Sequence, residues 1–154
     1  MKNWIRWMAL GAFAAVPALA VTVCEVSATG MAFGAYNAIS SQHVDTLGTI
    51  TVTCTGTVGD PVNLTLTLSA GNGSYTNREM TDGTHNMLYN LYTDGSRSQV
   101  WGDGTGGTGT VTDSFTMSSS VEVKNYTVYG RIFGSQNQLV VQSYSDSVAV
   151  TLTY

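Results

Sequence analysis

The sequence predicts an all-β protein, an antiparallel β-sandwich of six or seven strands. Three observations predict this class. Apolar and polar residues alternate with a period of two, turn-forming residues separate the alternating stretches, and hydroxyl side chains outnumber charged ones. From residue 21 onward there are 22 Thr and 15 Ser against 10 acidic and 4 basic residues. This composition excludes coiled coils, which need abundant charged residues, and nucleic-acid binders, which need clustered lysine and arginine.

The individual strands follow from the alternation. The stretch 49–55 reads TITVTCT and the stretch 62–68 reads VNLTLTL, so β-branched or aliphatic side chains fall on one face and mostly threonine on the other. The expected strands, in chain order, are 23–33, 49–55, 62–68, 87–93, 110–117, 122–133 and 148–154. Turn signals separate them at 56–61, 71–77, 82–83, 94–95 and 102–109.

Residues 1–20 read as a secretory signal peptide. Lys2 and Arg6 supply a positive start, a short apolar core follows, and Ala18-Leu19-Ala20 offers the small residues that signal peptidase requires. The alternative, a membrane anchor, needs about 20 apolar residues, more than this run contains. Cleavage after Ala20 leaves one domain, 21–154, with a formal charge of −6 and no apolar run long enough to span a membrane.

Both cysteines, Cys24 and Cys54, lie in the exported portion. Two cysteines in an oxidising compartment predict one disulfide, because the chain has no CxxC motif and its two distant histidines do not complete a zinc site. The bond would close a loop of about 30 residues and contribute roughly 3–4 kcal/mol in the chain-entropy account.

Residues suited to catalysis or cofactor binding are scarce. His43 and His85 lie in no nucleophile motif, and most of the acidic residues sit in turns, where aspartate is a common turn former. The glycine-rich stretch 102–109 lacks the Gly-Lys-Ser/Thr ending and the helix of a phosphate loop. We therefore expect no enzyme activity, no cofactor, no metal and no nucleic-acid partner.

Aromatic residues near turns suggest a second interpretation. Tyr36, Tyr92 and Trp101 could share an exposed patch, and the protein would then be a self-sufficient adhesive or carbohydrate-binding sandwich. Taken one at a time, each ring is better explained as a cap on the end of the sandwich.

The last predicted strand ends with the given sequence at Tyr154. Nothing in the sequence covers the free edge of that strand, so it is an edge open to strand addition.

Several segments together resemble the spore coat protein U domain family, the pilin subunits of archaic chaperone–usher pili. The matching pieces are CEVS at 24–27, FGAY at 33–36, GTITVTC at 48–54, LTLSAG at 66–71 with Arg78 and Met80, LYNLYTD at 88–94, WGDG at 101–104, YGRI at 129–132 and YSDSVAVTLTY at 144–154. They cover essentially the whole chain after residue 20, in order.

The resemblance implies an immunoglobulin-like sandwich that lacks its last strand. A periplasmic chaperone lends a strand to the gap, and at the outer-membrane usher another pilin subunit replaces it with its own donor strand. Val148, Val150, Leu152 and Tyr154 would line the edge that contacts the chaperone or donor. Four or five apolar side chains filling the gap would contribute at most about 6–15 kcal/mol. That rivals the stability of a whole domain, about 5–15 kcal/mol.

The chain departs from the family pattern before the first cysteine. Family members that polymerise carry a donor segment before the first cysteine, and a donor strand that fills five alternating positions needs about nine to eleven residues. Predicted cleavage leaves only Val21-Thr22-Val23 ahead of Cys24. The sequence thus predicts a non-catalytic subunit of a surface pilus or coat, exported through the periplasm, that accepts a strand without giving one. This favours a terminal, tip or minor subunit.

Overall fold

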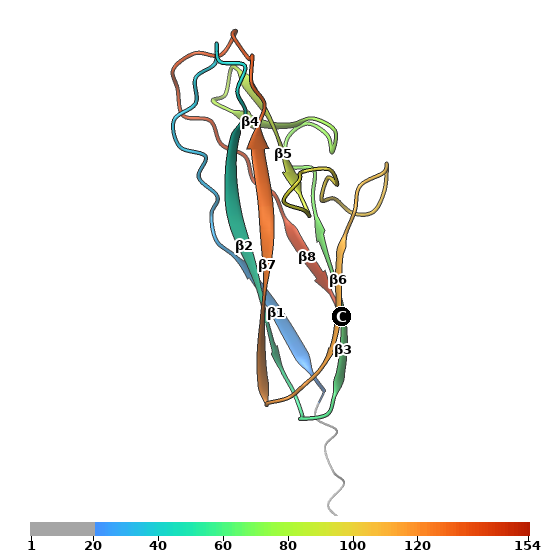
Figure 1. The fold of residues 1–154 in the computed structure, drawn as a ribbon. Helices are drawn as coiled ribbons and strands as arrows, with labels where there is room; N and C mark the ends of the chain where they lie inside the picture. The colour runs from blue at the N-terminus through green and yellow to red at the C-terminus, as the bar shows by residue number, and fades with distance from the viewer. Residues whose placement is uncertain (1–20) are drawn as a thin grey trace, which may run out of the picture.

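Residues 21–154, which the computed structural model describes, form eight strands in two packed sheets (Figure 1). The strands are β1 (Val23–Ala28), β2 (Val44–Thr55), β3 (Pro61–Leu68), β4 (Arg78–Thr81), β5 (Asn86–Tyr92), β6 (Val111–Thr116), β7 (Val121–Ile132) and β8 (Val150–Thr153). Every strand pair is antiparallel, which confirms the predicted all-β sandwich. The predicted signal peptide, 1–20, lies outside the described residues. None of the described residues belongs to a helix long and apolar enough to cross a membrane.

The larger sheet has the order β1-β2-β7-β5-β4 and the smaller sheet the order β6-β3-β8. The core lies between them and follows the alternation seen in the sequence. In β3, for example, Leu64, Leu66 and Leu68 are buried, while the threonines between them are half-buried on the other face. Burying one face of each sheet against the other is what holds the two layers together.

The disulfide predicted between Cys24 and Cys54 is present, with an S–S distance of 2.01 Å. The two cysteines are directly opposite each other in the β1–β2 ladder, and both are buried. The bond therefore ties the first strand to the sheet at the end of the molecule where β1 begins.

Strand β1 is shorter than predicted and β2 is longer. The β1–β2 ladder ends where Ala28 pairs with Ile50, so the stretch 29–33 is not a strand. Here the chain packs onto the larger sheet over Gly48 and Gly130, whose missing side chains leave room for it. A Cβ atom built on Gly130 would lie 2.5 Å from the Met31 sulfur and 2.8 Å from the Phe33 ring.

Strand β4 was not predicted, because its sequence REMT carries two charges and no alternation that marks a strand. Arg78 is nevertheless fully buried. Its guanidinium donates hydrogen bonds to the carbonyl oxygens of Ser69 and Trp101 and to Oδ1 of Asn90, at 2.7–2.8 Å for the shortest bond to each. These acceptors replace the water that an arginine normally requires.

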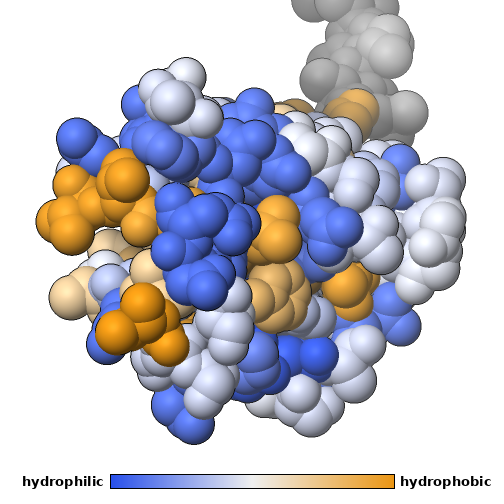
Figure 2. All heavy atoms as spheres, turned by 90° about the horizontal axis from the view of Figure 1, so that it is seen from above, coloured by the Kyte–Doolittle hydropathy of each residue, from blue (hydrophilic) through white to orange (hydrophobic). Residues whose placement is uncertain are grey.

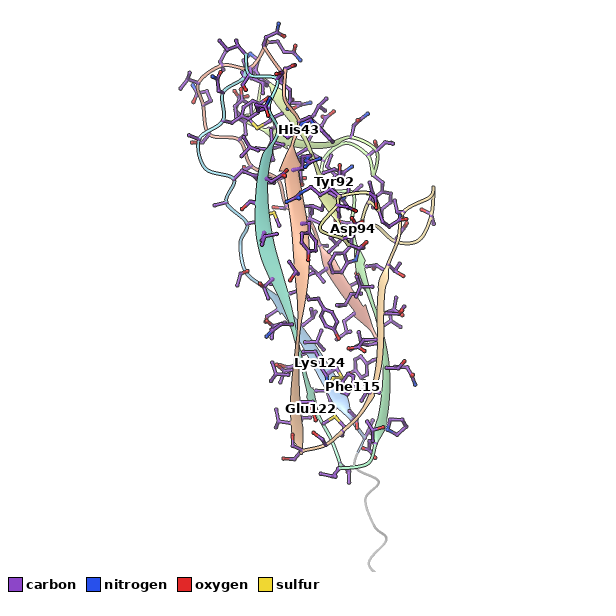
Figure 3. All side chains as sticks on the ribbon, in the orientation of Figure 1. His43, Tyr92, Asp94, Phe115, Glu122 and Lys124 are labelled. Atoms are coloured by element: carbon purple, nitrogen blue, oxygen red, sulfur yellow. A yellow bond between two sulfur atoms is a disulfide. The ribbon has the colours of Figure 1, made fainter. Side chains whose placement is uncertain are left out.

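The two edges of the smaller sheet differ in how they meet the larger one. At the β6 edge, polar contacts cross the sandwich: the Tyr126 hydroxyl donates to Asp113 at 2.9 Å, and the Lys124 ammonium lies 4.6 Å from the Phe115 ring centre (Figure 3). These contacts join β6 to β7. At the β8 edge, the residues just before the strand are tied to the larger sheet, because Ser145 and Thr81 of β4 exchange backbone hydrogen bonds and the Tyr89 hydroxyl donates to Asp146. Along β8 itself no hydrogen bond to the larger sheet is present among residues 21–154, and that edge forms the candidate site.

Candidate strand-accepting groove

The first wall of the site is β8 with the residues before it. The Ser69 N–H donates to the Ala149 carbonyl oxygen, and the Ala149 N–H donates to the Ser69 hydroxyl oxygen, both at 2.9 Å, so Ala149 directs its backbone groups toward the β3 side. Alternate residues of an antiparallel strand form backbone hydrogen bonds with the same neighbouring strand, so the backbone groups of Thr151 and Thr153 also point toward β3. The N–H and C=O groups of Val150 and Leu152 therefore point away from β3, to the side where the sheet has no further strand.

The opposite wall is the segment that follows β1. Within residues 21–154, the backbone N–H groups of 30–36 donate no hydrogen bond. Buried backbone donors are nearly always paired, so this segment is accessible either to water or to an added strand. Both walls thus present free backbone groups of the kind that a β-strand pairs with.

Two adjoining cavities lie between these walls. The first, of about 450 Å³, is bordered by 28–31 and 144–150, and its floor is the core itself. The second, of about 830 Å³, is bordered by 31–39 and 139–144. Residues shared by the two are Met31, Phe33, Met80 and Tyr144. We call the combined opening the acceptor groove.

The floor of the acceptor groove comes from both sheets. Ile50, Leu91 and Val128 belong to the larger sheet and Leu68 to the smaller one, and all four line the first cavity. A side chain entering the groove would therefore touch residues that already form the core. An opening that reaches the core between two sheets is the geometry of a sandwich that lacks a strand.

The predicted edge residues lie along this groove. Val148 and Val150 line the first cavity, and Leu152 is half-buried on the same inward face of the chain. Tyr154 follows the end of β8 and is 55% exposed. Its contact with a chaperone or donor stays a prediction, as does that of the other three.

The wide end of the groove opens at the pole formed by the loops 34–42 and 133–143. Among the exposed large hydrophobic residues are Ile39, Val140 and Val141 of these loops. Seen end-on, apolar surface appears there in separate patches between hydrophilic side chains (Figure 2).

The predicted aromatic patch is wrong. Trp101 is completely buried, and its indole N–H donates to the Leu66 carbonyl oxygen at 3.1 Å. Tyr92, at the end of β5 (Figure 3), is 7% exposed. Tyr36 is half-buried, with its hydroxyl donating to the Phe133 carbonyl oxygen at 2.7 Å. Proximity to turns suggested exposure, but Trp101 and Tyr92 are buried, and the polar atoms of Trp101 and Tyr36 have hydrogen-bond partners within the fold. The self-sufficient adhesive loses its support.

Ionisable side chains do not converge anywhere along the groove. His85 pairs with Asp82 in the β4–β5 turn at 3.0 Å, where two backbone N–H groups lower the pKa of Asp82 to about 2. Asp94 accepts hydrogen bonds from its own loop, which lower its pKa. Within residues 21–154, no three histidine, cysteine or acidic side chains are grouped to hold a metal ion. Neither the His85–Asp82 pair nor Asp94 lines the acceptor groove.

Comparison with protein families gives one match that spans nearly the whole chain. The model of the Spore Coat Protein U domain matches residues 9–151. The chain belongs to the spore coat protein U domain family. No curated protein sequence matches it significantly.

The family assignment agrees with a solved structure. A chain of the CsuC–CsuE chaperone–tip adhesion subunit pre-assembly complex, from the archaic chaperone–usher Csu pili of Acinetobacter baumannii, matches with a TM-score of 0.52 and 19% identity. The match covers 87% of this chain and 40% of that chain, so this chain corresponds to less than half of its length. At this identity the likeness concerns the fold.

Sequence reasoning found one wall of the groove in this family member and missed the other. The second wall, 28–39, lies partly within the strand predicted over 23–33, whereas β1 ends at Ala28. Asp146 was also missed, although the alternation of 144–154 places it in the same inward row as Val148. Extending the strand pattern back to Tyr144 would have shown a carboxylate among apolar positions.

Proposed function

We propose that this protein is a non-catalytic structural subunit of a bacterial surface pilus or coat, and that its acceptor groove receives a β-strand from another chain. The observation that carries the proposal is the groove along β8, which is open to the core and has unpaired backbone groups on both walls. Strand addition satisfies both requirements together, because the main chain pairs with the walls while alternate side chains fill the cavities.

The proposed partners follow from this mode of binding. A periplasmic chaperone would fill the groove first, and another subunit would replace it at an outer-membrane usher. The matched pilus complex, a chaperone with a tip adhesion subunit, supports this order of partners. The signal sequence predicted at 1–20 supports export through the periplasm to the cell surface.

Periplasmic expression with and without the cognate chaperone tests the proposal. We expect the protein to accumulate and co-purify with the chaperone, and to be degraded or to aggregate alone. Leu152→Asp, which puts a charge on the inward face of β8, should abolish co-purification, whereas the outward control Thr151→Asp should retain it. A stable, soluble monomer produced alone, whose melting temperature the chaperone does not raise, would refute an incomplete fold.

The place of the subunit in a fibre is a separate proposal. If cleavage follows Ala20, Val21–Val23 are the only residues before Cys24, and Val23 is already paired in β1. Such a chain accepts a strand but has none to give, which supports a terminal, tip or minor position. Mass spectrometry of the mature N-terminus tests this: a mature chain with about ten or more residues before Cys24 could span five alternating positions and would contradict it.

A further inference from the structure

One charged side chain interrupts the apolar lining of the acceptor groove. The residues of the β8 wall that face inward are Tyr144, Asp146, Val148, Val150 and Leu152. Of all the residues that line the two cavities, Asp146 is the one that carries a charge. A strand that fills the groove must therefore cover a carboxylate at one point and hydrocarbon elsewhere.

The Asp146 carboxylate is held in a fixed position. Its Oδ2 accepts a hydrogen bond of 2.6 Å from the hydroxyl of Tyr89, which is buried under the groove. Its Oδ1 accepts from the backbone N–H groups of Asn72 at 3.0 Å and Ser147 at 2.7 Å. Burial, reinforced by Asp146, raises the pKa of the Tyr89 phenol, so that phenol stays a donor. Three bonds therefore fix the carboxylate in the wall.

The backbone opposite Asp146 is shaped around it. A Cβ atom on Gly71 would lie 2.2 Å from Oδ2, and Gly71 has a φ of +64°, a conformation that favours glycine. The glycine turn thus leaves space that the carboxylate occupies. Any residue with a Cβ atom at position 71 would collide with the carboxylate.

The hydrogen bonds leave part of the carboxylate unsatisfied. Two carboxylate oxygens accept about four hydrogen bonds, and three are made within the chain. The remaining capacity is on Oδ2, which has a single partner. Water can supply the fourth hydrogen bond while the groove is open. An aliphatic side chain laid over the carboxylate would displace that water and could not donate a hydrogen bond in its place.

The charge of Asp146 is already partly compensated. Arg78 is buried directly opposite Tyr89 in the β4–β5 ladder, and the Tyr89 hydroxyl bonds to Asp146, so a fixed positive charge lies close to the carboxylate. A second cation placed in the groove would be repelled by Arg78 and would have to lose its water. The position therefore suits a neutral donor better than a lysine or arginine.

We propose that the strand filling the acceptor groove carries a hydroxyl or amide side chain at the inward position beside Asp146, and apolar side chains at its other inward positions. Asp146 would then fix the register of the incoming strand, because a slip by two residues would place an aliphatic side chain over the carboxylate. This inference rests on the proposed strand-accepting function and specifies the chemistry of the partner.

Binding of synthetic peptides that are present while the mature protein refolds, so that they can occupy the groove, tests the inference. The probes are alternating peptides of about eleven residues with five inward positions. Each inward position in turn carries Val, Thr or Lys, and dissociation constants are measured by fluorescence anisotropy. We expect one inward position to prefer Thr over both Val and Lys by about tenfold, equivalent to about 1.4 kcal/mol, and the other four to prefer Val.

Variants of the protein identify the residue responsible. Asp146→Val should reverse the preference at that one position, while the outward neighbour Ser147→Val should leave it unchanged. If Asp146→Val does not fold, Asp146→Asn keeps the side-chain shape and should bring Val and Thr to within about threefold of each other. A preference for Val at every inward position of the unaltered protein, or a Thr preference that survives both substitutions, would overturn the inference. If no peptide binds, the strand-accepting function itself is refuted.

Discussion

The buried guanidinium of Arg78 should be a major determinant of stability. The perturbation is Arg78→Met, which keeps an unbranched side chain of similar length and removes the charge. The carbonyl oxygens of Ser69 and Trp101 have Arg78 as their hydrogen-bond donor within the described chain, so the substitution leaves both without a partner. Asn90 is less affected, because its Oδ1 also accepts from the Leu91 N–H at 2.9 Å.

The magnitude follows from those two carbonyls. Each buried acceptor left without a partner costs about 1–3 kcal/mol, which gives about 2–6 kcal/mol for Arg78→Met. Replacing a buried charge with hydrocarbon is neutral or stabilising in some proteins where its partners are replaced as well. Here the partners include main-chain carbonyls that a side-chain substitution cannot remove. The net effect should therefore be destabilising.

Urea unfolding followed by intrinsic fluorescence measures this effect, because Trp101 is the single tryptophan after residue 20 and it is buried. The control is Arg131→Met, which breaks a more exposed pair with Asp45 and should cost up to about 1 kcal/mol. If Arg78→Met does not fold, Arg78→Lys keeps the charge without the forked geometry and should still lose stability. A stability of Arg78→Met within about 1 kcal/mol of the unaltered protein would refute the reasoning.

Three further predictions concern other parts of the fold. Replacing Cys24 and Cys54 together with alanine should lower the free energy of unfolding by about 3–4 kcal/mol, and reduction of the unaltered protein should reproduce the loss. Folding lowers the pKa of Asp82, so the stability it contributes is present above about pH 4 and disappears as the pH falls toward 2. The melting temperature should fall less steeply over that range in Asp82→Asn, and an unchanged slope would contradict this. Gly130→Ala crowds the side chains of Met31 and Phe33 and should lower the free energy of unfolding by about 1–3 kcal/mol. Gly30→Ala, with no atom within 4 Å of the new Cβ, should be nearly neutral, and equal effects of the two substitutions would contradict tight packing at Gly130.

The clearest alternation in the sequence was the most reliable guide to the fold. The stretches 49–55 and 62–68 became parts of β2 and β3 with their apolar residues buried, because a period of two is a local property of an extended chain. The disulfide was also predictable, since it needed only two cysteines and an oxidising compartment. β4 was not, because the burial of Arg78 depends on acceptors contributed by three distant segments.

One wall of the candidate site could be predicted and the other could not, again because a sequence shows only local alternation. The β8 wall shows its inward face in the sequence, as Val148, Val150 and Leu152. The other wall could not be recognised, because the departure of 29–36 from β2 depends on the space above Gly130. Burial of Trp101 likewise depends on β3, which supplies the acceptor for its indole N–H.

The sequence by itself determined that this chain is a threonine-coated β-sandwich with one disulfide and an apolar last strand. Those properties follow from local periodicity and from composition. Only the tertiary structure decided that the edge of β8 lies open on the core, that a second unpaired wall faces it, and that Asp146 interrupts the lining between them. Whether an edge is covered depends on contacts between residues far apart in the chain, and no local pattern records these.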